Sequence, residues 1–370
     1  MTGNDIIKHI EDWAPKSIAW ERDNVGLQIG SLNRKVSNIM LCLDVTQNVV
    51  DEAIRKKCNF IFSHHPLLFH SLRSINTDDD EHSQIIEKLI QNKITLYSAH
   101  TNLDFTKDGV SFELAKTLKL KNIKFLESIK SEQYKLVVYI PADSVDKVAD
   151  AIFNAGGGAI GNYSNCSFRS NGTGTFEGSE ESNPTIGERE KLAFVDEVKF
   201  EVLVNKPKLN KVVTSMINAH PYEEVAYDII PLANENTVYG NGAIGILEKE
   251  LTEKEFLDYI SKKLKTKNLR YTKGQIKKIK TVAVCGGSGS DLFKRAIQKN
   301  ADAFITADIK YHTFQDAQHK ILLIDAGHFE TEIHSLNAVE GKLLQLMNKK
   351  MKSNIYKYSG STNPIIFYNN

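Results

Sequence analysis

Short runs of apolar residues alternate with amphipathic stretches through residues 1–125. The apolar runs NIMLCLDV, NFIFSHH and ITLYSAH begin at positions 38, 59 and 94 and have the length of buried strands. Between them, VVDEAIRKK and SQIIEKLIQN carry apolar residues at helical spacing. This alternation predicts an α/β fold, in which helices pack on a largely parallel sheet.

The same pattern returns after residue 242. Residues 280–308 read as strand, turn, helix and second strand, as residues 38–65 do. In each block a later apolar strand leads to a histidine that is followed, four residues on, by a carboxylate. These pairs are His100 with Asp104, and His328 with Glu332. We therefore predict an internal duplication, with two α/β halves related by a pseudo-twofold axis.

The middle of the chain has a different pattern. A strand–helix block and a later strand–helix–strand block suggest a β-α-β-β-α-β sandwich of about 100 residues. Between these blocks, residues 155–190 are rich in Gly, Ser and Asn and poor in apolar side chains, so we expect a long mobile loop. The predicted domains are residues 1–127 and 236–370, which form the duplicated α/β core, and the insert at residues 128–235.

Composition narrows the class of protein. A chain of 370 residues with 25% charged residues is expected to form two or three globular domains. Its net charge of +1 provides no general field for nucleic acid or anionic lipid. The four cysteines form no CxxC pair, the N-terminus is an amphipathic charged helix, and no stretch approaches the ~20 apolar residues of a membrane span. We expect a cytoplasmic protein without a membrane partner.

Histidines gather where the predicted strands end. His64 and His65 follow the run NFIF, and Pro66 ends that strand, which leaves the chain free to turn both imidazoles one way. Ligands of α/β folds lie at the carboxyl ends of strands. The alternative for each position is an ordinary histidine in a turn or at a strand edge.

Two further features carry candidate chemistry. If a helix begins after Gly327, His328 and Glu332 fall on one helical face, where they could hold one ion or form a solvated pair. His312 lies near the end of a further predicted strand. The segment GGSGSD at 286–291 follows the strand TVAVC, and it could be either a phosphate cradle or a plain tight turn.

Imidazole and carboxylate together suit zinc, iron, manganese, nickel or cobalt rather than calcium. A carboxylate that bridges two ions, with histidines on each side, is what a dinuclear hydrolytic site requires. The histidines and carboxylates at the strand ends thus favour a site for divalent transition-metal ions.

The motifs SHHP, SAHTNLD and GHFETE, with DNVGLQIG and ITADIKYH, resemble those of the NIF-three-like proteins, known as GTP cyclohydrolase I type 2 homologues. The resemblance covers nearly the whole chain and implies a two-metal site, with zinc as the first choice. The implied ligands are His64, His65, Asp104, His328 and Glu332. It also implies that residues 128–235 resemble a trimer-forming P-II/CutA-like domain, and that the protein forms a toroidal homohexamer.

The resulting functional hypothesis is metal-dependent hydrolysis of a nucleotide or another phosphate-bearing small molecule. If the cyclohydrolase name describes the activity, His100 or His312 would transfer protons as general acid or base. A phosphodiesterase would use the same ions to neutralise charge on phosphoryl oxygens. The alternative class is a non-catalytic regulatory or metal-handling protein whose insert senses a small ligand.

Overall fold

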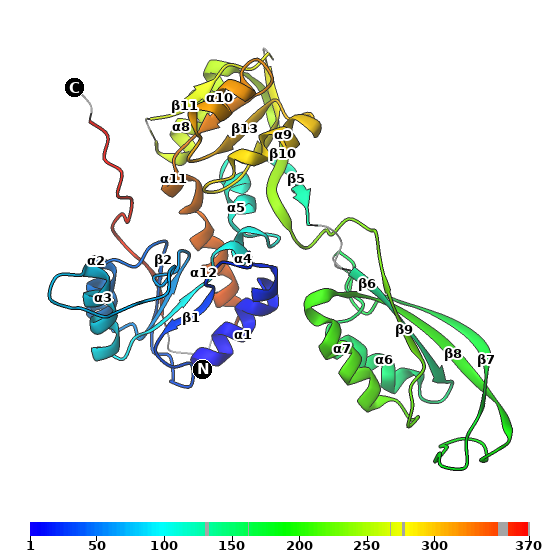
Figure 1. Cartoon of the computed structure of the whole chain (residues 1–370). Helices are drawn as coiled ribbons and strands as arrows, with labels where there is room; N and C mark the ends of the chain where they lie inside the picture. Colours follow the sequence, from blue (N-terminus) through cyan, green and yellow to red (C-terminus); the bar gives the residue numbers. More distant parts are fainter. Residues whose placement is uncertain (130–132, 162, 267, 276–277, 347–353, 369–370) are drawn as a thin grey trace. The chain divides into compact units, whose positions relative to one another are not determined.

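The computed structural model describes residues 1–129, 133–161, 163–266, 268–275, 278–346 and 354–368. The chain divides into two compact units (Figure 1). The first combines Met1–Glu127 with Tyr239–Asn370, and the second is Ser128–Val238. The larger unit contains two α/β lobes, each built on one sheet. In each lobe, both faces of the sheet are covered, and each face has its own hydrophobic core.

The first sheet has the strand order β1-β4-β3-β2-β15. Its strands are β1 (Gly26–Ile29), β2 (Ile39–Cys42), β3 (Phe60–Ser63), β4 (Thr95–Ser98) and β15 (Ile355–Lys357). All neighbours are parallel except β1, which pairs antiparallel with β4. The helices of this lobe are α1 (Gly3–Trp13), α2 (Gln47–Arg55), α3 (Glu81–Gln91) and α12 (Ser335–Leu346).

The apolar runs become central strands because both faces of this sheet are covered. Ile39 and Leu41 pack with α1 and α12, whereas Met40 and Cys42 point to the opposite face, against α2 and α3. Continuous rather than alternating hydrophobicity is typical of parallel strands that are buried on both sides.

The second sheet has the order β11-β14-β13-β12-β10-β5. Its strands are β5 (Lys121–Ser128), β10 (Gly240–Thr252), β11 (Arg270–Thr272), β12 (Lys278–Val284), β13 (Ala303–Thr306) and β14 (Leu322–Asp325). Helices α5 (Val110–Thr117) and α8 (Glu253–Leu264) cover one face, and α9 (Phe293–Gln298) and α10 (Tyr311–Ala317) cover the other.

The two lobes share a topology, as a duplication predicts. In each, three parallel strands are flanked by an antiparallel edge strand: β1 on β4 in the first lobe, and β11 on β14 in the second. The lobes nevertheless exchange elements. Helix α12 and strand β15, from the end of the chain, complete the first lobe, while α5 and β5 pack in the second (Figure 1). The halves of the sequence are therefore not the halves of the structure.

The Ser128–Val238 unit has the element order β-α-β-β-α-β. Its elements are β6 (Gln133–Pro141), α6 (Val145–Asn154), β7 (Ser167–Glu177), β8 (Leu192–Asn205), α7 (Lys206–Ala219) and β9 (Tyr227–Pro231). The antiparallel sheet has the order β7-β8-β6-β9, so the first and last strands, β6 and β9, are neighbours. Helices α6 and α7 cover one face of this sheet through a shared core.

The prediction of a mobile loop over residues 155–190 was wrong for residues 167–177, about a third of that range. Strand β7 occupies Ser167–Glu177 and pairs with β8 along its whole length. The strand lies at the edge of the sheet and most of its side chains are exposed, so it needs no apolar pattern. Backbone pairing with β8 holds it in place.

Within the described residues, the helices fall short of the length and hydrophobicity that crossing a bilayer requires. All four cysteines are free, and Cys42, Cys58 and Cys285 are buried, as their apolar neighbours predict.

Candidate metal centre

The candidate site begins where the parallel strands β3 and β4 end. His64 and His65 directly follow β3, and His100 lies two residues beyond β4. Helix α4 (Thr101–Asp104) begins immediately after His100 and ends on Asp104. Because adjacent parallel strands end at the same edge of a sheet, these side chains meet there.

The two adjacent histidines share one site. Their backbone N–H groups continue the ladder, with 3.1 Å from His64 N to Cys42 O and 2.9 Å from His65 N to Leu43 O. The rings nevertheless lie side by side, with centroids 4.9 Å apart, and both approach His100, at 5.3 and 5.4 Å. The turn before Pro66 thus brings three imidazoles together.

The second lobe contributes one short helix. Helix α11 (His328–Glu332) follows β14 and starts after Gly327, whose φ of 91° favours glycine. On this helix His328 Nε2 lies 3.1 Å from Glu332 Oε2. The same carboxylate reaches the first lobe, with Oε2 3.0 Å from His65 Nε2 and Oε1 3.7 Å from His64 Nε2. Glu332 therefore joins the two halves of the site.

Each of the four histidines is oriented by a hydrogen bond at its ring nitrogen Nδ1. The Nδ1 atoms of His64, His65, His100 and His328 hydrogen-bond to Ala99 O at 2.9 Å, Asp44 Oδ1 at 2.7 Å, Asp23 Oδ1 at 2.9 Å and Asp308 Oδ2 at 2.6 Å, respectively. An oxygen acceptor on Nδ1 orients the ring and leaves Nε2 free to bind a cation. This is the arrangement of histidines that ligate metals.

Two buried atoms at the centre, His64 Nε2 and Asp104 Oδ1, have no hydrogen bond within the described part of the chain. Glu332 Oε2 differs from them, because it pairs with His65 Nε2 at 3.0 Å and with His328 Nε2 at 3.1 Å. His64 Nε2 lies 3.6 Å from Asp104 Oδ1, so these atoms face one another. Leaving buried polar atoms without partners costs about 1–3 kcal/mol each, more for charged groups. A cation held between them would supply the missing interaction.

The pKa values of the site residues indicate how the site is protonated without an ion. Burial alone lowers the pKa of His65, but its contacts with Asp44 and Glu332 outweigh burial and raise that pKa to about 10. For His328, contacts with Glu332 and Asp308 likewise outweigh burial and raise the pKa to about 9. Burial raises the pKa of Asp104. Protons on imidazoles therefore balance the buried carboxylates in the ion-free protein.

The donors fit transition-metal ions. Two overlapping groups each place three donor atoms within 4.8 Å of one another: His64, His65 and His100, and His65, His328 and Glu332. Imidazole nitrogen with carboxylate oxygen is the donor set of zinc, iron, manganese, nickel or cobalt sites. The Asp104 carboxylate lies at the edge of the first group through its contact with His64.

The structure thus brings together six of the seven residues singled out in the sequence. His100, expected to transfer protons, stands among the candidate ligands. His312 lies on α10 with an exposed side chain, and its Nδ1 contacts Gln315 at 3.0 Å. It belongs to neither group of donors among the described residues.

Sequence reasoning missed the outer carboxylates Asp23, Asp44 and Asp308. Asp44 and Asp308 offered a signal, because each stands just beyond a parallel strand that adjoins one leading to a histidine. Asp23 offered none, since it lies in an irregular segment before β1. Hydrogen bonds from His100 and Thr101 outweigh burial and lower the pKa of Asp23 to about 2.

The glycine-rich segment 286–291 supports the site. The amides of Gly286, Gly287 and Gly289 donate to the hydroxyls of Ser111, Thr331 and Thr306 at 3.3, 3.0 and 3.0 Å. A Cβ on Gly287 would lie 2.1 Å from Glu332 Oε1. These contacts favour the tight-turn interpretation, because the amides that would hold a phosphate already bind hydroxyls.

The chain is similar to known proteins over its whole length. A sequence profile of Duf34/NIF3 (NGG1p interacting factor 3) matches residues 1–364. Proteins called "GTP cyclohydrolase 1 type 2 homolog" from Halalkalibacterium halodurans and Bacillus subtilis are 42% and 39% identical, covering 99% of this chain and 98% and 99% of their own lengths. The crystal structure of a Bacillus cereus protein related to NIF3 has a TM-score of 0.88 at 39% identity, covering 100% of this chain and 99% of that one. The chain therefore belongs to the Duf34/NIF3 family.

Proposed function

We propose that the chain is a dinuclear metal-dependent hydrolase acting on a nucleotide or another phosphate-bearing small molecule. The observation that carries the proposal is the pair of buried atoms without hydrogen bonds, His64 Nε2 and Asp104 Oδ1, beside the Glu332 carboxylate that contacts three of the histidines. The name of the relatives, GTP cyclohydrolase 1 type 2 homolog, supports a nucleotide as the substrate class.

The two overlapping donor groups support two ions, and zinc suits their nitrogen-rich composition best. A pair of divalent cations supplies Lewis acidity that activates water and neutralises charge on phosphoryl oxygens. The chain's own residues would hold that pair: Glu332 belongs to the second donor group and also approaches His64 of the first, and Asp104 lies beside His64.

His100 is the proposed proton-transfer group. Its Nδ1 is fixed on Asp23, so Nε2 faces the cluster, and its side chain is only half-buried and within reach of a bound molecule. His100 also lies among the candidate ligands. The two roles differ in outcome: His100→Gln should retain both ions while losing turnover if the residue transfers protons, and should lose an ion if it is a ligand.

A toroidal homohexamer, with threefold contacts through a P-II/CutA-like insert, completes the proposal, together with a cytoplasmic location. Light scattering of the purified protein tests the assembly. A mass six times that of the 41.6 kDa chain is expected.

The experiment that tests the function is turnover of a nucleotide panel, including GTP, by protein loaded with zinc, manganese or iron. His65→Ala removes a residue common to both donor groups and should abolish turnover. His312→Ala is the matched control, because that histidine is exposed and outside both groups. If protein loaded with two ions turned over no member of the panel, the hydrolase would be rejected in favour of a regulatory or metal-handling role.

A further inference from the structure

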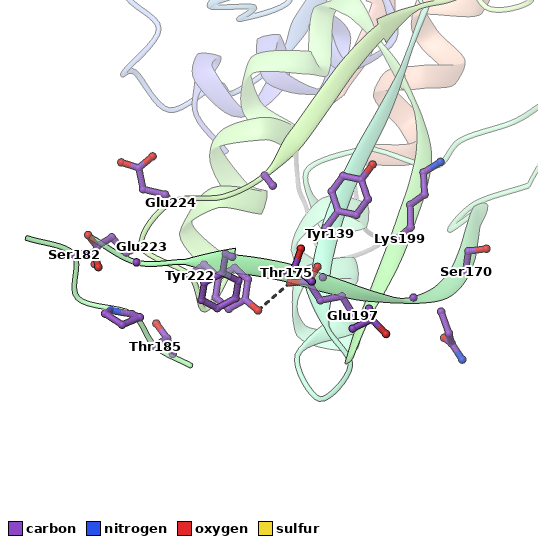
Figure 2. Close-up of a pocket in the computed structure, with 18 residues that line it drawn as sticks. Tyr139, Ser170, Thr175, Ser182, Thr185, Glu197, Lys199, Tyr222, Glu223 and Glu224 are labelled. Carbon is purple, nitrogen blue, oxygen red and sulfur yellow. Dashed lines mark hydrogen bonds between the residues drawn. The ribbon is translucent and has the colours of Figure 1, made fainter. Parts of the chain in front are cut away.

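The Ser128–Val238 unit contains a cavity of about 700 Å³ that the proposed hydrolysis does not use (Figure 2). Its lining residues come from β6, β7, β8, the segment that follows β7, and the segment that follows α7. Ligand pockets are typically ~300–1,000 Å³. The cavity is therefore large enough for a small organic molecule.

The sheet forms one wall of the cavity. In antiparallel strands, directly opposed residues point to the same face. Gly172 on β7 opposes Glu197 on β8, and Lys199 on β8 opposes both Ser170 on β7 and Tyr139 on β6. All five residues line the cavity.

Two glycines of β7, Gly172 and Gly174, leave space beside this wall that side chains would otherwise fill. A Cβ on Gly172 would meet nothing within 4 Å, whereas a Cβ on Gly174 would lie 2.1 Å from Glu197 Oε2. The Glu197 carboxylate thus takes the space that a side chain at position 174 would fill. The space over Gly172 stays empty.

The opposite wall is tied in place by hydrogen bonds. Asn183 N donates to Glu223 Oε2 at 3.2 Å, and Thr185 Oγ1 donates to Pro221 O at 2.9 Å, so the segments after β7 and after α7 hold each other. Tyr222 bridges to the sheet, because its hydroxyl donates to Glu197 Oε1 at 2.9 Å (Figure 2). The cavity is therefore largely pre-formed.

Tyr222 is also held by contacts with His220 and Phe176. Its backbone N–H donates to His220 Nδ1 at 3.1 Å, and His220 Nε2 hydrogen-bonds to Tyr139 O at 3.0 Å. Its ring meets Phe176 edge-on, with centroids 5.7 Å apart. Two aromatic rings of the cavity thus have set orientations.

The charge of the lining is unbalanced. Glu197, Glu223 and Glu224 contribute three carboxylates, and Lys199 is the cation among the lining residues. Lys199 Nζ already lies 2.8 Å from Glu201 Oε1, outside the lining set. Among the described residues of the unit, no lysine or arginine forms an ion pair with the three lining carboxylates.

We propose that this cavity binds a small organic cation, an ammonium or guanidinium group carried on an aromatic or apolar body. The carboxylates would receive the charged group, and the rings of Tyr139, Phe176 and Tyr222 would receive the body, with cation–π attraction from the tyrosines. An anion of the same shape meets the carboxylates unfavourably. A bare metal ion would leave the aromatic surface without a contact.

The test uses the full chain and two probes of similar shape and opposite charge, tryptamine and indole-3-acetate. Saturation-transfer NMR and calorimetry measure binding. Tryptamine is expected to bind at least about tenfold more tightly than indole-3-acetate, and Glu197→Gln is expected to weaken tryptamine about tenfold. Asp150→Asn, which removes an exposed carboxylate of helix α6 outside the cavity, is the matched control and should change nothing.

Gly172→Leu provides a second variant, because its side chain would enter empty space without backbone strain. It should abolish tryptamine binding and leave the melting temperature and the metal content unchanged. Equal binding of both probes, or binding that survives Gly172→Leu, would overturn the proposal. A third result would also overturn it: neither probe binds the wild type, and the Gly172→Leu variant has a lower oligomeric mass than the wild type by light scattering. That combination would mean that a second copy of the chain covers the cavity.

Discussion

Gly287→Ala is a test of the site that substitutes none of the proposed ligand residues. A Cβ at position 287 would lie 2.1 Å from Glu332 Oε1, where ordinary contacts begin at 3.4 Å. Because real Cβ contacts are essentially never shorter than 3.0 Å, the two atoms must separate by at least 0.9 Å, the difference between 3.0 and 2.1 Å. Metal–ligand distances tolerate only about ±0.2 Å. The substitution should displace the one carboxylate that joins the two lobes.

The expected loss can be bounded. Changing a residue that merely supports a ligand typically lowers metal affinity ~10–100-fold, about 1.4–2.8 kcal/mol, and displacing a ligand should reach or exceed the upper end. A chromophoric chelator in competition with the protein would measure the affinity. Elemental analysis after dialysis would measure the ions retained.

Backbone strain needs its own control, because Gly287 has a φ of +60°. Gly161 has a φ of +59° and open space around its Cβ position. Ala in this region costs about 1–2 kcal/mol at either position. Gly161→Ala is therefore the control. Gly287→Ala and Gly161→Ala should lose similar thermal stability in the ion-free state, and only Gly287→Ala should lose metal. Wild-type metal affinity in Gly287→Ala would refute the position assigned to Glu332.

Three further predictions concern the surroundings of the site. Metal binding near pH 8 should release the protons of His65 and His328, because ion-free pKa values of about 10 and 9 keep both protonated there; release should vanish well above pH 10, and calorimetry in two buffers of different ionisation enthalpy measures it. Thr362→Val should weaken metal binding severalfold, since Thr362 Oγ1 donates at 2.7 Å to Asp44 Oδ2 and the other oxygen of Asp44 holds His65; Thr362→Ser should bind as the wild type does. Replacing residues 128–238 by a short Gly/Ser linker should leave metal content unchanged and lower the oligomeric mass by light scattering, because the insert supplies none of the candidate ligands and its terminal strands are neighbours.

The parts of the fold that sequence predicts are those where burial decides the structure. Strands β2, β3 and β4 and their helices are evident because both faces of the sheet are covered, which requires continuous apolar runs. Strand β7 left no such signal, since it is an exposed edge strand whose glycines border a cavity rather than a core. The exchange of α12 and β15 between the lobes is equally hidden, because periodicity reports that a helix is amphipathic and not which sheet it covers.

The site divides in the same way. His64, His65 and His328 could be predicted because each follows an apolar strand, and α/β folds bind their ligands at the carboxyl ends of strands. The role of Glu332 across both lobes depends on how the second lobe packs on the first, which no local pattern encodes. His312 shows the converse: it follows a strand, but it faces outward from α10 and lies outside both donor groups of the described chain.

A crystal structure of metal-loaded protein, with anomalous scattering recorded at the edge of the bound metal, tests the dinuclear site most directly. The expected result is two peaks ~3.5–4 Å apart. One should lie at the donor group of His64, His65 and His100, with Asp104 beside it, and the other at the group of His65, His328 and Glu332. A single peak, or the absence of any peak at these residues after full reconstitution, would contradict a dinuclear centre.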